Sequence, residues 1–443
     1  MSIPLVALLA MALPAQDTSR LTLEAAVRLA LERAPSVEAA RQALAGARGA
    51  TREARAQWYP QVSVEGSAFR HEEEMLVAPI HTLALTPGSP LPPFDRTLVQ
   101  GNLSLGWTVY DGGVRSGRIA QNGALEDAAR AQTDAALQSL IASVVQSYAE
   151  VQAAQEAVGA EEHRRTALTA EQVRVNRFLT EGRAARLEQL RVDAAVAAAE
   201  ADRATAQSRL EVAQAALARL VGLPIGATQA ALLQTVRPAA GQMPIRDSLL
   251  QRARATSPVL QAAASRAAAA DAAIRAAGAA WFPTVRVDGR VVSYGSASGS
   301  YSTEWQAGAR VAWPIFTGGS RGASVDRAEA AALEARAQLA DAELALFNDV
   351  DQAAATLTET GRRIAALEAA VGHLTEAQRV EALALEQGAG TQADFLRAEA
   401  DLAEARSALA QARAGWIAAR VQLARLTGTL TPDALTDIVT IEP

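Results

Sequence analysis

The chain contains two copies of one sequence pattern, and this duplication limits its possible folds more than any other feature. Residues 58–66 read WYPQVSVEG and match residues 281–289, which read WFPTVRVDG, at an offset of 223 positions. Residues 107–113 match residues 313–319 at an offset of 206 positions. Self-similarity over such a distance indicates two structural repeats built on one plan.

The repeats differ in length at one place only. Residues 107–222 match residues 313–428 with no net insertion, so a fixed length is preserved there. The 17-residue difference between the two offsets falls between Trp58 and Trp107. Five prolines lie within residues 71–97 of that window, and we expect these residues to form a loop that points into solvent.

Four segments show the two-residue period of half-buried strands. Val62 and Val64, for example, alternate with Ser63 and Glu65. We expect strands at residues 61–69, 99–110, 284–293 and 304–316.

Long segments without proline predict helices on either side of the strands. Thr22 is expected to cap the first helix, which breaks before Pro35. A helix over residues 116–180 would be about 95 Å long at 1.5 Å per residue. The expected helices are 22–57, 116–180 and 184–221 in the first repeat (16–222), and 246–280, 321–386 and 391–426 in the second (246–428). Outside the repeats we expect a signal peptide at residues 1–15, a linker at 223–245 and a C-terminal tail at 429–443.

The composition excludes several classes of function. Alanine supplies 106 of the 443 residues, which favours long, closely packed helices over thick globular cores. The chain has no lysine and no cysteine, so Walker-type phosphate loops, Schiff-base chemistry and zinc–thiolate sites are excluded. A net charge of −6 argues against nucleic-acid binding. We expect no enzyme activity, no cofactor and no metal site.

Aromatic residues concentrate at the ends of the expected strands. Of 18 aromatic residues, 13 lie within residues 58–110 and 281–316. Such placement is typical of the interfacial girdle of a transmembrane β-barrel, and a small soluble β-layer with an aromatic core is the alternative. The expected girdle residues are Trp58, Tyr59, Trp107, Tyr110, Trp281, Phe282, Trp313 and Phe316.

Four strands are too few to close into a barrel, and an open sheet leaves backbone groups that lipid cannot satisfy. We therefore expect the chain to associate with further copies of itself. The polar faces of the strands would then line a water-filled conduit. The expected lumen residues are Glu65, Arg286, Asp288, Arg290 and Arg310.

Short motifs that recur in both repeats resemble the TolC-type outer membrane efflux protein family over about residues 20–430. A tryptophan–aromatic–proline passage begins at Trp58 and Trp281, and an aromatic-X-Gly-Gly passage begins at Tyr110 and Phe316. The other matching motifs are LTLEAA at residues 21–26 with Ala34 and Pro35, Gly-x5-acidic-x-Leu at Gly182 and Gly388, and Arg-Leu-x-Gly at Arg219 and Arg425.

The resemblance implies a mainly α fold with a β-barrel portion. Four strands and long coiled-coil helices from each protomer of a homotrimer would form a twelve-stranded barrel in outer-membrane lipid and a twelve-helix periplasmic tunnel. The chain would be the exit duct of a tripartite efflux or type I secretion system, passively conducting substrates delivered by a periplasmic adaptor (membrane fusion) protein and a proton-driven or ABC inner-membrane pump. A soluble periplasmic coiled-coil scaffold or tether with a small β-cap is the alternative.

In this family the helical turns lie at the periplasmic tip, where the tunnel narrows and the adaptor docks. The residues that the resemblance implies at this tip are Gly182, Glu188, Arg191, Gly388, Asp394 and Arg397. A ring of Asp394 carboxylates would attract cations. Thr391 and Asp394 also form the pattern of a helix capping box, and Arg397 is placed to pair with Asp394, so both interpretations of Asp394 stay open.

Overall fold

The computed structural model describes residues 20–82, 93–224, 232–239 and 245–441, so the expected signal peptide lies outside the described residues. The chain divides into two units. The helical unit comprises residues 1–41, 132–260 and 343–443, and the sheet unit comprises residues 42–131 and 261–342.

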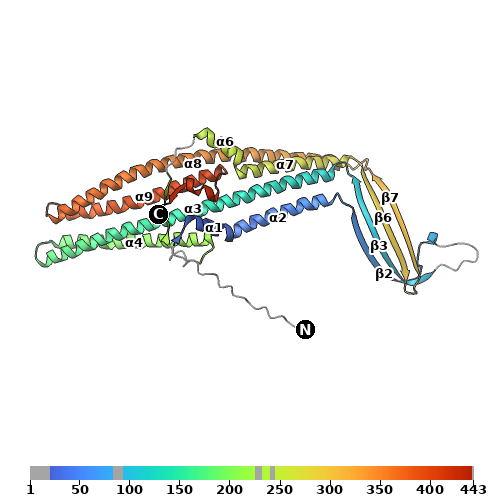
Figure 1. Ribbon diagram of the computed structural model, residues 1–443, viewed down its shortest axis with the longest axis horizontal. Helices are drawn as coiled ribbons and strands as arrows, with labels where there is room; N and C mark the ends of the chain where they lie inside the picture. The colour runs from blue at the N-terminus through green and yellow to red at the C-terminus, as the bar shows by residue number, and fades with distance from the viewer. Residues whose placement is uncertain (1–19, 83–92, 225–231, 240–244, 442–443) are drawn as a thin grey trace, which may run out of the picture. The chain divides into compact units, whose positions relative to one another are not determined.

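The sheet unit contains an antiparallel sheet of four strands (Figure 1). The strands are β2 (Gln61–Leu76), β3 (Phe94–Tyr110), β6 (Thr284–Ser296) and β7 (Tyr301–Ala312), in the spatial order β2-β3-β6-β7. Each repeat supplies one hairpin, and the two hairpins join where β3 pairs with β6. Within the described chain, β2 and β7 are therefore the open edges of the sheet.

The first hairpin is longer than its polar–apolar alternation indicates. Residues 71–76 and 94–97 belong to β2 and β3 rather than to the expected loop. The ladder continues past a bulge to the pair of Met75 and Asp95. The glutamates at 72–74 lie within this bulge, and the pairing that resumes at Met75 extends both strands.

The strands of the second hairpin also begin and end at residues other than those expected. β6 continues to Ser296, and β7 begins at Tyr301 rather than at residue 304. β7 also ends at Ala312 rather than at residue 316. Pro314 accounts for the early end, because proline has no N–H to donate to a ladder.

The helices follow the two repeats (Figure 1). They are α1 (Leu23–Arg33), α2 (Pro35–Ala56), α3 (Val114–Thr180), α4 (Arg186–Val221), α6 (Arg246–Thr256), α7 (Pro258–Gly278), α8 (Ser320–Glu386) and α9 (Gln392–Leu426). The Thr22 hydroxyl accepts a hydrogen bond of 3.1 Å from the backbone N–H of Ala25, which confirms the expected cap. Among the described helices, none is both long and apolar enough to cross a membrane.

The core of the helical unit includes segments expected to be linker and tail. Leu430, Leu435, Ile438 and Val439 are at most 2% exposed and pack with α1, α3, α4 and α9. The supposed tail thus forms a 3-10 helix (Pro432–Asp437) and β8 (Val439–Ile441), and β8 pairs with β5 (Val236–Pro238) from the linker. A second linker strand, β4 (Leu232–Leu233), pairs with β1 (Arg20–Leu21). These strands are too short to show a period in the sequence.

Tyr148 of α3 holds these linker strands to the helices. Its hydroxyl lies 2.8 Å from the carbonyl oxygen of Leu21 and 2.9 Å from that of Gln234. Burial raises the pKa of this hydroxyl, so it remains a donor. Gln152, one turn along α3, donates to the same Gln234 carbonyl over 2.6 Å and accepts from the N–H of Val236 over 3.2 Å.

Replacing Tyr148 with phenylalanine tests this attachment. We expect Tyr148→Phe to lower the free energy of unfolding by about 1–3 kcal/mol, because the Leu21 carbonyl oxygen loses its tyrosine donor while Gln152 still donates to the Gln234 carbonyl oxygen. Denaturant unfolding followed by circular dichroism measures the change. Ser143→Ala is the control on the same helix, since the exposed Ser143 hydroxyl bonds only within α3, and its effect should stay below about 0.5 kcal/mol. Equal losses in the two variants would contradict the attachment.

Candidate functional site

The register of the sheet brings polar side chains from all four strands to one face. Ser63 lies opposite Ser104, and their hydroxyl oxygens are 2.7 Å apart. Ser104 lies opposite Arg290, and Arg290 lies opposite Gln306. Side chains that face each other in a ladder point to the same side of a sheet, so a polar row crosses this one from edge to edge.

This polar face carries all five residues expected in a lumen. The register places Glu65, Arg286, Asp288, Arg290 and Arg310 on the same side as the paired serines. The Asp288 carboxylate accepts a hydrogen bond of 2.6 Å from Nε of Arg286. Glu304 shares this face and pairs with His81 at 3.1 Å, but the pattern of the sequence does not indicate it, because the expected strand only begins there.

The opposite face of the sheet is apolar and exposed. Val64 is 81% exposed, Trp305 is 75% exposed and Val311 is 67% exposed. A contiguous apolar surface of this kind marks contact with lipid or with another protein. The sheet therefore has one polar face and one apolar face.

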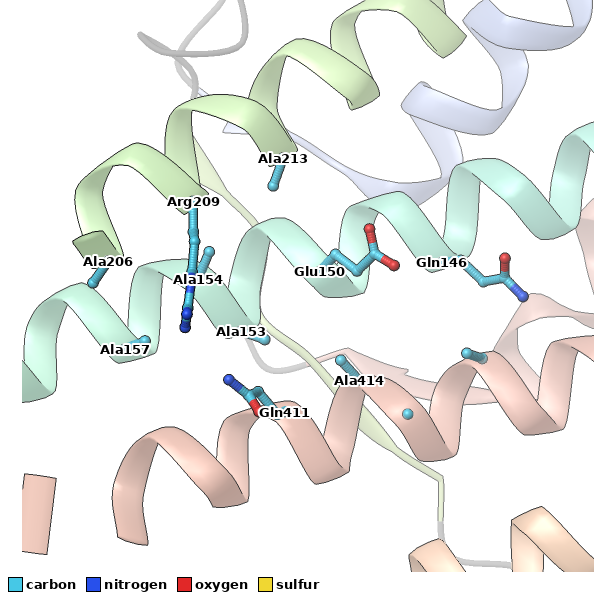
Figure 2. A pocket seen from close by; sticks show the side chains of 12 residues that line it. Gln146, Glu150, Ala153, Ala154, Ala157, Ala206, Arg209, Ala213, Gln411 and Ala414 are labelled. Carbon is cyan, nitrogen blue, oxygen red and sulfur yellow. The ribbon is translucent and has the colours of Figure 1, made fainter. Parts of the chain in front are cut away.

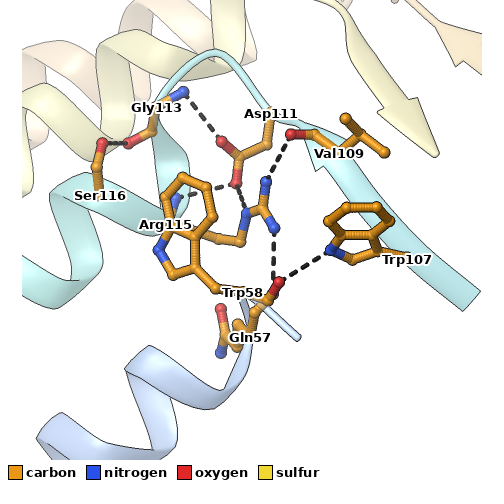
Figure 3. A network of polar contacts seen from close by, with 8 residues as sticks. All are labelled: Gln57, Trp58, Trp107, Val109, Asp111, Gly113, Arg115 and Ser116. Carbon is orange, nitrogen blue, oxygen red and sulfur yellow. Dashed lines mark hydrogen bonds and ion pairs between the residues drawn. The ribbon is translucent and has the colours of Figure 1, made fainter. Parts of the chain in front are cut away.

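A polar network fixes the turn from β3 into α3 (Figure 3). The Asp111 carboxylate accepts hydrogen bonds of 3.0 Å from the backbone N–H groups of Gly113 and Arg115, and one of 2.7 Å from Nε of Arg115. Gly112 and Gly113 have φ values of 68° and 104°, which glycine tolerates far better than other residues. The Gly-Gly pair thus allows the tight turn, and the aspartate holds it.

Arg115 ties this turn to the neighbouring helix and strand (Figure 3). Its guanidinium donates to the carbonyl oxygens of Gln57 and Val109 over 3.2 and 3.3 Å, and lies 4.2 Å from the centre of the Trp58 ring. Nε1 of Trp107 donates to the carbonyl oxygen of Trp58 over 2.9 Å. The aromatic pair and the buried arginine together close the junction.

The second repeat builds the same junction with different side chains. Arg321 lies 4.4 Å from the centre of the Trp281 ring and donates to the carbonyl oxygen of Ile315 over 3.0 Å. Nε1 of Trp313 donates to the carbonyl oxygen of Trp281 over 3.1 Å. The residue beside the guanidinium is Thr317, whose hydroxyl lies 3.2 Å from Nε of Arg321.

The two junctions therefore differ in one charge, because Asp111 of the first repeat corresponds to Thr317 of the second. Arg115 and Arg321 are 206 positions apart, the same offset as the repeats, and this offset is the signal that would have indicated them in the sequence.

The residues expected in an aromatic girdle lie at these junctions and are 40–87% exposed. They are Trp58, Tyr59, Trp107, Tyr110, Trp281, Phe282, Trp313 and Phe316.

The helical hairpins α3–α4 and α8–α9 turn at Gly182 and Gly388, whose φ values are 71° and 73°. The N–H of Gly182 bonds to the carbonyl of Leu179 over 3.0 Å, and that of Arg183 bonds to the carbonyl of Phe178 over 2.7 Å. After α8, the N–H of Gly388 bonds to the carbonyl of Leu385 over 3.2 Å, and that of Ala389 bonds to the carbonyl of Ala384 over 2.8 Å. Both turns are Schellman motifs, which require a left-handed residue at the glycine position.

Thr391 caps α9, and Asp394 lies in the first turn of that helix. The Thr391 hydroxyl accepts a hydrogen bond of 3.2 Å from the N–H of Asp394 and lies 2.6 Å from the Asp394 carboxylate. In the described part of the chain, Arg397 forms no ion pair with Asp394. Glu188 occupies the first turn of α4, and Arg191 is exposed one turn further on.

The same amide–carboxylate contact links the two arms of each hairpin. Gln172 donates to Asp193 over 2.8 Å, and Gln378 donates to Glu399 over 2.6 Å. Burial raises the pKa of Glu399, and the bond from Gln378 counters part of that rise. The repeated spacing fixes how the arms of each hairpin align.

A groove of about 410 Å³ lies between α3, α4 and α9 (Figure 2). Small alanine side chains such as Ala154, Ala213 and Ala414 form most of its walls, and Glu150 and Arg209 supply charges. No cluster of three or more metal-ligating side chains occurs among the described residues.

A family model described as outer membrane efflux protein matches residues 26–223 and 249–429. Nodulation protein T of Rhizobium leguminosarum bv. trifolii is 25% identical over 311 residues, which cover 68% of this chain and 65% of that protein. The chain thus spans just under two thirds of the length of this curated relative.

Solved structures of outer membrane proteins share the fold, including those of VceC and CmeC. The outer membrane protein VceC of Vibrio cholerae has a TM-score of 0.76 at 21% identity, covering 92% of this chain and 96% of that one. The CmeC outer membrane channel of Campylobacter jejuni has a TM-score of 0.80 at 15% identity, covering 94% and 88%.

Matched substitutions at the two junction arginines test the charge difference between the repeats. We expect Arg115→Gln to lower the free energy of unfolding by about 3–5 kcal/mol, because it leaves the Asp111 carboxylate buried and unpaired. Arg321→Gln leaves no charge behind and should cost about 1–2 kcal/mol. Denaturant unfolding in detergent measures both. Adding Asp111→Asn to Arg115→Gln should recover part of the loss, and no recovery would show that the ion pair is not the cause.

Proposed function

The chain belongs to the outer membrane efflux protein family, and from this membership we propose that it is the exit duct of a tripartite efflux or type I secretion system. The family consists of transport channels of the outer membrane with long periplasmic helical extensions, and not of enzymes. Its members form trimers and work within tripartite efflux systems. A soluble scaffold is therefore set aside.

The observation that carries the proposal is a sheet with one polar face, one apolar face and two open edges. Backbone groups along β2 and β7 need partners in lipid, and neighbouring copies of the same sheet supply them. Three copies give twelve strands, with the polar faces around a water-filled lumen and the apolar faces toward lipid. The junction aromatics then lie at the interface between lipid and water.

In the same arrangement the helical hairpins of three protomers form a periplasmic tunnel that conducts substrates passively. Energy comes from an inner-membrane pump, either proton-driven or ABC, that a periplasmic adaptor protein connects to the duct. We place the tip of the tunnel and the docking of the adaptor at the turns of Gly182 and Gly388, beside Glu188, Arg191, Asp394 and Arg397.

The full chain, purified from outer membranes in mild detergent, tests this proposal. Light scattering should give the mass of three protomers, and planar bilayers should show discrete conductance steps.

Val64→Arg should prevent stable insertion, because an arginine on a lipid-facing strand costs about 2–4 kcal/mol near the bilayer centre. Glu65→Arg, on the opposite face of the same strand, should insert normally. A monomer without conductance, or equal insertion of both variants, would contradict the barrel.

The tip is tested by Asp394→Ala. If Asp394 lines the aperture, the variant should lower the preference of single channels for potassium over chloride. Removing the carboxylate while keeping Thr391 leaves the hydroxyl cap of α9 in place. Glu376→Ala removes the same charge at an exposed position of α8 and serves as the control. A change confined to thermal stability would limit Asp394 to stabilising the first turn of α9.

A further inference from the structure

The charges on the polar face of the sheet are sorted into rows by the register. The charged row nearest the helices contains Thr108, Arg286 and Arg310, and we call it the basic row. Three rows further along the strands lie Glu65, Asn102, Val292 and Glu304, which we call the acidic row. Six residues of extended strand separate the two rows, or about 20 Å. The sign of the charge therefore reverses along the sheet.

The rows between them hold Asp288 and Arg290, so three arginines stand against one carboxylate at the end of the sheet near the helices. That carboxylate is committed to Arg286 at 2.6 Å. Arg290 and Arg310 form no ion pair within the described ranges. Arg286 and Arg310 face each other directly across the ladder, an arrangement that costs stability. This end of the sheet keeps a positive charge that its own residues do not neutralise.

Two glycines make room among these arginines. A Cβ at Gly106 would overlap the guanidinium of Arg286, so glycine leaves this side chain free to lie across β3 without moving its end. Gly308 faces Asp288 in the ladder, and a Cβ there would meet no atom within 4 Å. The result is a hollow of about 510 Å³, lined by the three arginines, Asp288 and polar groups of β3 and β7.

We propose that Arg286, Arg290 and Arg310 form a binding site for oxyanions carried through the channel, that is, for solutes with carboxylate, phosphate or sulfonate groups. The inference rests on the proposed function, which turns this face toward the lumen and repeats the site in each protomer. Guanidinium groups bind such groups through paired, charge-assisted hydrogen bonds. The acidic row repels the same solutes, so they concentrate at the end near the helices.

Purified protein in planar bilayers tests the site, with sodium tripolyphosphate as the probe. Micromolar-to-millimolar tripolyphosphate should block the wild-type current in a saturable manner. The double variant Arg290→Gln/Arg310→Gln should lose this block, and its chloride-to-potassium permeability ratio should fall about twofold or more. Arg70→Gln is the matched control, because Arg70 lies on the same sheet but alternates onto the opposite, apolar face. It should leave both the block and the ratio unchanged.

A lysine variant separates binding from charge and guards against a folding defect. Arg290→Lys/Arg310→Lys keeps the charges and should keep the permeability ratio, while the block weakens because lysine lacks the planar fork. Wild-type current without tripolyphosphate block, or equal block in the wild type and the glutamine variant, would overturn the site and leave the duct intact. Absence of any wild-type conductance would instead contradict the proposed function.

Discussion

The backbone N–H and C=O groups on the outer edges of β2 and β7 have no partner strand within the described chain, and in hydrocarbon each unpaired group costs several kcal/mol. The other features of the sheet unit follow from the need to pair these backbone groups. This need accounts for a polar face and an apolar face that run across all four strands, and it makes association of copies a condition of insertion. The pairing of β3 with β6 serves the same need inside one chain, because it joins the hairpins of the two repeats into one sheet.

The sequence pattern was sufficient wherever a feature is local and repeated. Alternation of Val62 and Val64 with Ser63 and Glu65 identified the two faces, and glycine at positions 182 and 388 identified the hairpin turns. The family resemblance that these motifs suggested is confirmed by the family match. The extent of β2 escaped prediction, because the ladder resumes at Met75 beyond an irregularity that contains the glutamates, and no side-chain pattern indicates this.

Features that depend on distant contacts were the ones that the sequence concealed. Val439 of the supposed tail is buried because its strand pairs with a strand of the linker, two hundred residues earlier in the chain. Arg115 looks like an ordinary charged residue near a helix start, and only the fold brings Trp58 and Gln57 against it. The order of the charged rows likewise follows from the ladder register and not from the composition of any strand.

The ion pair of Asp111 with Arg115 has no counterpart beside Arg321, and this difference has a mechanical consequence. Around the proposed trimer, three junctions with the ion pair alternate with three junctions without it. We expect the junctions without the ion pair to bend more easily, so the resistance of the ring to bending would have threefold rather than sixfold symmetry. A bending load on the assembly would then be taken up first at the joints near Thr317. The two repeats of one chain would thus respond unequally to the same load, because Asp111 in one corresponds to Thr317 in the other.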